Sequence, residues 1–242
     1  MTHLPESAPA RRLGTHGRTE VEMMDAGNEA RRTGALVLIA GALAALSLVL
    51  AMTATAASAC GICGKNLIKN PGAEAGRGVM AVGAFGAVPG WTVAAGQFGA
   101  ASYAFPNGWF SVASKGPKSR GKNYFFGGTT MTAVEAAESI GTQTIRLPAS
   151  AAGRKATLSG WIGNYTDNRT QVRAQFMDAS GAVLSTVRIG PAVTIAGTDM
   201  GFRSRFGKVP AGTKQVTISV IFSGGGAIYK LAGADNLSLV LS

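Results

Sequence analysis

The stretch QVTISVIF, Gln215 to Phe222, shows the pattern that decides the fold. Apolar Val216, Ile218, Val220 and Phe222 alternate with other residues, and Gln, Thr and Ser take the first positions between them. Alternation with a period of two residues is typical of a β-strand with one buried and one solvent-exposed face. The stretch therefore predicts a strand with a core side and a wet side.

Ten further segments have a strand-like composition and are separated by Gly, Pro, Asn and Asp, which favour turns. They are NLIKN (66–70), GWTVAA (90–95), ASYAF (101–105), NYFFGG (123–128), TQTIRLP (142–148), KATLSGWIG (155–163), TQVRAQFMD (170–178), AVLSTVRI (182–189), FRSRFGKVP (202–210) and NLSLVL (236–241). DASG, Asp178 to Gly181, predicts a hairpin turn. TAVEAAES, Thr132 to Ser139, favours a short helix or a loop. Eleven strands in one domain predict an all-β sandwich or barrel.

The two ends of this β-rich region carry its most specific motifs. The region opens with NLIKNPGAE at 66–74, continues to VPGW at 88–91 and closes with GADNLSLVL at 233–241. This order resembles the galactose-binding-like jelly rolls, particularly secreted bacterial carbohydrate-binding modules, over nearly all of residues 66–242. The resemblance implies a two-sheet β-sandwich of the jelly-roll type, in which the first and last strands are neighbours.

The resemblance also implies a structural calcium ion. In many members of the family an early Glu and a late Asp bind calcium with backbone carbonyls, and the matching positions are Glu74 and Asp235. Calcium prefers about six to eight oxygen ligands of these kinds. Ala73 departs from the family, which commonly has an aromatic residue there, so we expect looser packing. In the alternative interpretation, both carboxylates are exposed turn residues that cap backbone N–H groups.

The residues before the β-rich region resemble an export signal. Positive charge precedes the apolar run Ala35 to Met52, and Ala57-Ser58-Ala59 then fits a small-x-small cleavage site. We expect a signal peptide with an apolar helix at 1–59, a short linker at 60–65 and the β-sandwich domain at 66–242.

Three alternatives for this leader stay open. An uncleaved apolar run would anchor the chain in a membrane. Cys60 would be a lipid-attachment site, although Ala57 stands where lipoprotein signals usually have Leu. Met23 or Met24 would be a later start of the chain. Membrane contact is expected only through the leader or a lipidated Cys60.

Positive charge is concentrated after the leader. From residue 60 onward 18 Lys and Arg face seven Asp and Glu, so the whole formal charge of +11 lies there. Such a field attracts anionic polymers, although solubility is the plainer explanation. No signature of a nucleic-acid module accompanies the basic residues. We expect a monomer that binds a polysaccharide or other anionic envelope polymer, and no specific nucleic acid.

Residues for catalysis are scarce. Both histidines, His3 and His16, lie in the leader, which excludes His-based nucleophiles and His metal sites from the rest of the chain. CGIC, Cys60 to Cys63, predicts a small local disulfide, or a lipidated first cysteine with a spare thiol, rather than a redox helix. Glu135 and Glu138 are candidates for the two carboxylates of a glycosidase. We expect no catalysis.

Aromatic side chains are the candidates for sugar contacts, because flat rings pack against the apolar faces of sugars. Trp161 shares a strand face with Thr and Ser, which makes it a candidate platform with Arg173 and Gln175 on a nearby polar face. Packing under a covering loop is the alternative for this residue. Tyr165, in the loop GNYTDNRT, is the second candidate. The resemblance to the family implies that Trp91, after Val-Pro-Gly, fills the core. Trp109, Tyr103 and Tyr124 complete the aromatic candidates.

The sequence therefore predicts a secreted or surface-held, non-catalytic β-sandwich that recognises a glycan or an anionic cell-envelope polymer. A structural or adhesive envelope protein without a sugar pocket is the alternative. A polysaccharide-active hydrolase fits the sequence less well.

Overall fold

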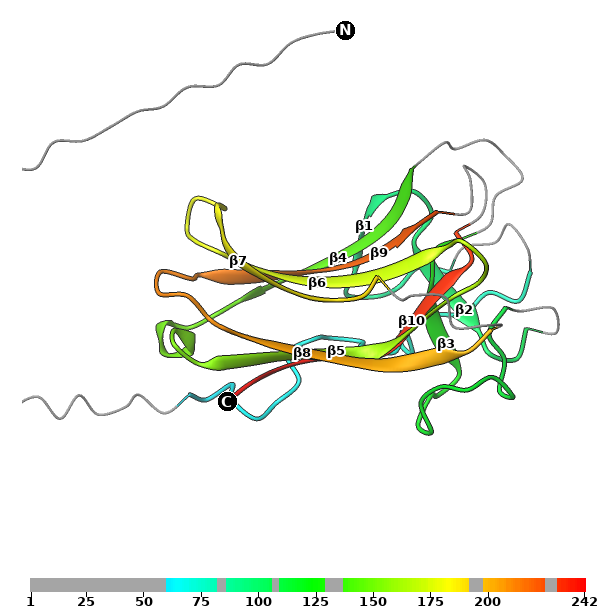
Figure 1. Ribbon diagram of the computed structural model, residues 1–242, viewed down its shortest axis with the longest axis horizontal. Helices are drawn as coiled ribbons and strands as arrows, with labels where there is room; N and C mark the ends of the chain where they lie inside the picture. The colour runs from blue at the N-terminus through cyan, green and yellow to red at the C-terminus, as the bar shows by residue number, and fades with distance from the viewer. Residues whose placement is uncertain (1–59, 82–85, 106–108, 129–136, 192–197, 225–229) are drawn as a thin grey trace, which may run out of the picture. The chain divides into compact units, whose positions relative to one another are not determined.

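The computed structural model describes residues 60–81, 86–105, 109–128, 137–191, 198–224 and 230–242. These residues form two five-stranded antiparallel sheets that face each other as the layers of a sandwich (Figure 1). The predicted two-sheet β-sandwich is therefore confirmed. The predicted signal peptide with its apolar helix lies outside the described residues, as does Glu135.

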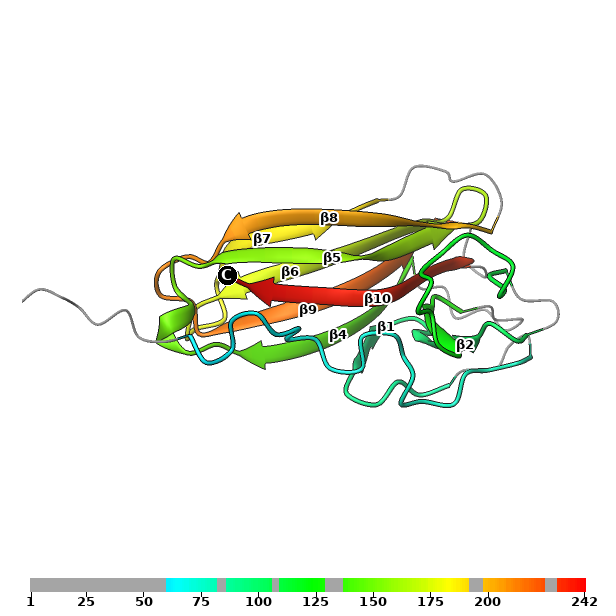
Figure 2. The same ribbon diagram turned by 90° about the horizontal axis from the view of Figure 1, so that it is seen from below.

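Strands from distant parts of the chain are neighbours in both sheets. Sheet I consists, in order, of β1 (Thr92–Ala95), β4 (Glu138–Arg146), β9 (Gln215–Ser223), β6 (Arg169–Met177) and β7 (Val183–Ile189). Sheet II consists of β2 (Gly99–Ser102), β3 (Asn123–Phe126), β10 (Ala232–Leu241), β5 (Lys155–Asn164) and β8 (Met200–Lys208), and the short 3-10 helix η1 (Ala149–Ala151) precedes β5. The edge strands β7 and β8 lie side by side along one edge of the sandwich (Figure 2).

The main core fills the space between the sheets. Val216, Ile218, Val220 and Phe222 of β9 are completely buried, which confirms the core side expected from the sequence. On the other side Gln215 and Thr217 are partly exposed, but Ser219 and Ile221 are buried. Trp91 also packs on this core, with its ring centroid 4.9 Å from that of Phe125. Burial of these apolar faces is the main force that holds the sheets together.

The structure corrects two expectations. NLIKN is not a strand: Asn66 forms an isolated bridge with Val240, and its side chain accepts a hydrogen bond from Leu239 N at 3.0 Å. The two ends of the β-rich region are still neighbours, as the resemblance implies. The expectation of a short helix or a loop over 132–139 is wrong at its end, because Glu138 begins the strand β4. Residues 132–136 lie outside the described part.

A second apolar cluster covers part of the outer face of sheet II. We call it the outer cluster; its buried members are Ala101, Tyr103, Phe110, Tyr124, Phe126 and Met200. Arg120 stabilises the loop that precedes β3, because its guanidinium donates to Ser111 O and Ser114 O, both at 2.8 Å. The outer cluster covers β2 and β3 and extends to Met200 at the start of β8. The face formed by β5 and β8 continues beyond it.

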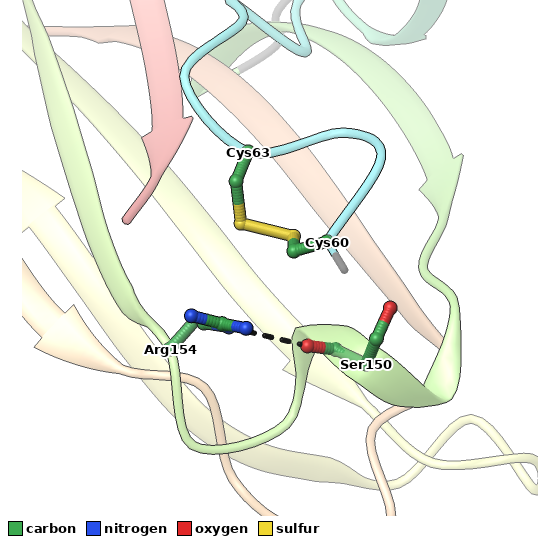
Figure 3. Close-up of a disulfide and its surroundings, with 4 residues drawn as sticks. All are labelled: Cys60, Cys63, Ser150 and Arg154. Carbon is green, nitrogen blue, oxygen red and sulfur yellow. Dashed lines mark hydrogen bonds between the residues drawn. A yellow bond between two sulfur atoms is a disulfide. The ribbon is translucent and has the colours of Figure 1, made fainter. Parts of the chain in front are cut away.

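The described chain begins with a disulfide between Cys60 and Cys63, as one of the two sequence interpretations expects (Figure 3). Gly64 N then donates to Leu241 O at 2.9 Å, so this first turn is attached to β10. Figure 3 also shows the Arg154 guanidinium donating to Ser150 O in the turn before β5. No helix among the described residues has the length and hydropathy needed to cross a membrane.

Candidate functional site

Glu74 is held in a turn between the first residues of the domain and β3. The turn contains two left-handed residues other than glycine, Asn70 and Ala73, with φ of 48° and 60°. The Glu74 carboxylate is exposed and accepts hydrogen bonds from the backbone N–H of Lys122 at 3.0 Å and of Asn123 at 2.8 Å. Glu74 therefore fixes the start of β3 to the entrance of the domain.

Asp235 lies in β10 and has no solvent exposure. Its Oδ2 accepts from the Tyr103 hydroxyl at 2.8 Å, and its Oδ1 accepts from Asn236 N at 2.6 Å. Burial raises the pKa of the Asp235 carboxyl to about 7; both hydrogen bonds oppose this rise, and the nearby Glu74 charge adds to it. Burial, with the Asp235 charge next, also holds the pKa of the Tyr103 hydroxyl far above its ordinary value.

The two carboxylates predicted to hold calcium converge on one turn. A Cβ placed on Gly72 would lie 3.0 Å from Asp235 Oδ1 and 3.7 Å from Glu74 Cγ, so both side chains surround this glycine. The four carboxylate oxygens all accept hydrogen bonds from the protein. Within the described ranges, no three His, Cys, Asp or Glu side chains gather at one point.

These contacts bear on both interpretations of Glu74 and Asp235, as calcium ligands or as exposed turn residues that cap backbone N–H groups. The alternative interpretation holds for Glu74, which is exposed and binds backbone N–H groups, but it is wrong for Asp235, which is buried. Two carboxylates beside a glycine turn are suitable donors for calcium, and each oxygen can accept more than one partner. The calcium site stays a prediction, with Glu74 and Asp235 as its carboxylate ligands.

The structure separates the residues that the sequence grouped into one sugar site. Trp161 lies on the outer face of sheet II, opposite Phe202 of β8. Arg173 and Gln175 lie on β6, where they pair with Arg188 and Thr186 on the outer face of sheet I. The expectation of a nearby polar face is therefore wrong, because β5 and β6 belong to different sheets. Trp161 and the Arg173–Gln175 pair face opposite sides of the sandwich and cannot contact one sugar residue together.

The other aromatic candidates divide between core and surface. Tyr103 and Tyr124 are buried in the outer cluster, and Trp109 stacks on Phe126 with ring centroids 5.2 Å apart. Tyr165 is 38% exposed on the loop between β5 and β6, and its backbone carbonyl accepts from Asn168 Nδ2 at 2.8 Å. Tyr165 therefore stays a candidate contact on an anchored loop, whereas Tyr103 and Tyr124 do not.

An aromatic strip runs along the outer face of β5 and β8; we define it as Trp161, Phe202 and Phe206. Phe202 is 53% and Phe206 is 70% exposed. Trp161 packs on the outer cluster with one side and lies 5.8 Å from Phe202 between ring centroids. Phe202 and Phe206 are four residues apart on one strand, so about 13 Å separates them along the sheet. The strip is long enough for its rings to contact different residues of a sugar chain.

Sequence reasoning missed Phe202 and Phe206. The segment FRSRFGK was recognised as a strand, and its alternation separates Phe202, Ser204 and Phe206 from Arg203 and Arg205. The usual assignment would bury the Phe face and expose the Arg face. The pairing of Arg205 with buried Leu158 shows that the Arg face points toward sheet I instead. Because β8 is an edge strand, its inward Arg side chains reach solvent at the side of the sandwich.

No family model and no curated protein matches the chain. Among solved structures, the enzymatically active domain of tailspike protein 4 of bacteriophage CBA120 aligns with 73% of this chain and 21% of its own, at 17% identity and a TM-score of 0.50. TmCBM61 in complex with β-1,4-galactotriose aligns over 74% and 99%, at 16% identity and a TM-score of 0.46. The CBM22-1 xylan-binding domain of Paenibacillus barcinonensis Xyn10C aligns over 74% and 96%, at 10% identity and a TM-score of 0.42.

At these identities the likeness is one of fold alone. The matched part spans about one fifth of the tailspike chain, so it corresponds to one portion of that protein. Carbohydrate-binding modules are among the solved structures to which the β-sandwich is similar.

Proposed function

We propose that the chain is a non-catalytic carbohydrate-binding protein, secreted or held at the cell surface, and that the aromatic strip contacts the sugar. The exposure of Phe202 and Phe206 on a strongly basic protein carries this proposal. Large exposed rings that gather on one face are uncommon unless the face binds something. An aromatic face suits the apolar C–H face of a pyranose ring.

Polar groups for the sugar hydroxyls lie on the same face. Ser159 of β5 pairs with Ser204 of β8 on one side and with Ser238 of β10 on the other. A row of three hydroxyls therefore crosses the sheet at the level between Phe202 and Phe206. The Lys155 ammonium lies 4.6 Å from the centroid of the Phe206 ring. A face with two exposed rings, a hydroxyl row and a cation over one of the rings supports recognition of an extended polysaccharide.

Substitution of Phe202 tests the proposal. In affinity electrophoresis through a panel of neutral and acidic polysaccharides, with calcium present, Phe202→Ala is expected to weaken the binding of a retarding polymer at least tenfold. Full burial of a Phe side chain is worth about 1.5–3 kcal/mol, and a tenfold loss corresponds to about 1.4 kcal/mol. Val93→Ala is the matched control, because Val93 is 54% exposed on β1 of the other sheet. Retardation of the native protein that Phe202→Ala leaves unchanged would remove the strip from the proposal.

The structural or adhesive alternative uses the same strip differently. If no polysaccharide retards the native protein, and Phe202→Ala abolishes self-association in sedimentation, the strip serves contact between envelope proteins. A hydrolase is disfavoured by the roles of four of the described carboxylates; of the two glycosidase candidates, Glu138 begins β4 and Glu135 lies outside the described residues. Asp235 is buried, Glu74 binds backbone groups, Asp178 caps the turn after β6 through Ser180 N, and Asp199 pairs with Lys115.

A further inference from the structure

A basic groove runs between the two edge strands β7 and β8. It has a volume of about 280 Å³, and its lining includes Val187, Ser185, Arg188, Arg205, Phe206 and Lys208. Gly207 brings the strands together at its floor, because a Cβ there would lie 2.6 Å from Val187 Cγ2. The groove is therefore a fixed feature of the sandwich edge, formed where glycine allows one sheet to approach the other.

Charge in the groove has one sign. Arg188 comes from β7, whereas Arg205 and Lys208 come from β8, so both walls contribute cations. Within the described residues, none of these three side chains forms a hydrogen bond or ion pair, and no carboxylate lines the groove. Like charges that line one groove repel each other to a degree set by their separation, and a bound anion would relieve this repulsion.

Ser185 adds a second feature that suits an anion. Its hydroxyl oxygen is buried and has no hydrogen-bond partner among the described residues. A buried hydroxyl without a partner carries a desolvation penalty of about 1–3 kcal/mol. A side-chain rotation that turns this hydroxyl into the groove would give a bound oxyanion a neutral donor beside the three cations.

Protection of sheet edges is the competing explanation for part of this arrangement. Inward-pointing charges on an edge strand prevent two sheets from pairing edge to edge, and Arg203 and Arg205 suit that purpose. Arg188 does not, because it pairs with Arg173 on the outer face of sheet I. Edge protection also gives no reason for residues of two strands that carry cations to line one groove with an unpartnered hydroxyl.

We infer that this groove binds the carboxylate or sulfate groups of an acidic polysaccharide, an inference that rests on the proposed carbohydrate-binding function. Phe206 belongs both to the groove lining and to the aromatic strip. A sugar chain on the strip therefore reaches the groove at Phe206, where its anionic substituent meets Arg205 and Lys208. The strip supplies affinity for sugar rings, and the groove selects chains that carry negative charge.

The test uses the purified full chain and two matched polymer pairs at 150 mM NaCl. The pairs are polygalacturonate with its methyl ester, and dextran sulfate with dextran; each pair differs in its anionic groups but shares its sugar backbone. The groove variant is Arg205→Gln with Lys208→Gln. The control is Arg146→Gln with Lys214→Gln, which removes the same charge from exposed sites outside the groove. Melting curves of both double variants establish that they are folded.

The groove variant is expected to bind at least one acidic polymer ten times more weakly than the native protein, while the control loses less than threefold. Equal losses in the two variants would overturn the inference, because general attraction would then account for binding. Absence of native binding to both acidic polymers would also overturn it. The proposed function is decided separately, by whether the neutral partners or other neutral polysaccharides bind and whether Phe202→Ala weakens that binding.

Discussion

Asp235 is a carboxyl group without solvent contact, and burial raises its pKa to about 7. The groups that face it are the Tyr103 hydroxyl, the Glu74 carboxylate and the Arg120 guanidinium. A folded pKa above the ordinary 3.8 means that the folded state holds this proton more tightly than the unfolded state does. The stabilisation is therefore complete below pH 4 and is lost as the pH rises to about 7.

Asp235 should make the free energy of unfolding depend on pH without calcium, and should make the stabilisation by calcium depend on pH as well. In chelator, the contribution of Asp235 to the free energy of unfolding should fall by up to about 4 kcal/mol between pH 4 and 8, and Asp235→Asn should flatten this fall.

Calcium needs the ionised carboxylate, so 1 mM calcium should add about 1.4 kcal/mol at pH 8, for a Kd of about 0.1 mM, and almost nothing at pH 5. Thermal melts at both pH values measure this; identical curves with calcium and chelator at pH 8 would exclude the calcium site.

The strand β8 shows why an edge element differs from a central one. Its partner β5 buries Leu158 and Ile162 on the inner face, yet the β8 residues on that face are Arg203, Arg205 and Gly207. A central strand could not place two Arg side chains there, because each charge would be desolvated. At the edge, the same side chains reach solvent, and the Phe face becomes available for binding.

Gly207 is the residue of β8 that sets its distance from β7. Gly207→Ala should force Val187 to move, because the new Cβ would lie 2.6 Å from Val187 Cγ2. We expect a loss of about 1–3 kcal/mol in the free energy of unfolding, the usual cost of overpacking. Urea denaturation measures it, and Gly181→Ala is a control without steric contact within 4 Å, although its φ of 86° adds backbone strain. A Gly207→Ala protein as stable as the native one would mean that the edge strands separate freely.

Most of the elements could be predicted from the sequence, because alternation and turn residues are local signals. Nine of the ten segments recognised beside Gln215–Phe222 contain or overlap strands of the structure. The face of Trp161 was also predictable, since Leu158 and Ile162 fix the buried parity of β5. The assignment of β5 and β6 to different sheets was not predictable, because hairpins and crossovers between sheets have similar loops. For the same reason, the separation of Trp161 from Arg173 and the exposure of Phe206 appear only in three dimensions.

The whole molecule carries a formal charge of +11. Glu74, Asp178 and Asp235 accept hydrogen bonds within the protein, whereas Asp199 pairs with Lys115. Charges of one sign on a compact surface repel each other and lower stability, whereas the unfolded chain spreads them apart. The Debye length falls from about 30 Å at 0.01 M salt to about 8 Å at 0.15 M, so salt reduces this repulsion. The net charge that attracts an acidic ligand therefore makes the unliganded protein sensitive to ionic strength.

Without ligand, the melting temperature should rise by about 2–4 °C when NaCl increases from 10 to 150 mM, which corresponds to about 1 kcal/mol for a domain of this size. The groove variant and its control both remove two positive charges, so both should show a smaller rise than the native protein. At 10 mM NaCl the groove variant should melt above the control, because its two lost cations belong to residues that line the same groove as Arg188, and no carboxylate lines that groove. Scanning calorimetry across the salt series measures all three proteins. A native melting temperature that falls as NaCl increases would show that the cations of the groove do not repel one another as proposed. A control variant that melts above the groove variant at 10 mM NaCl would show the same.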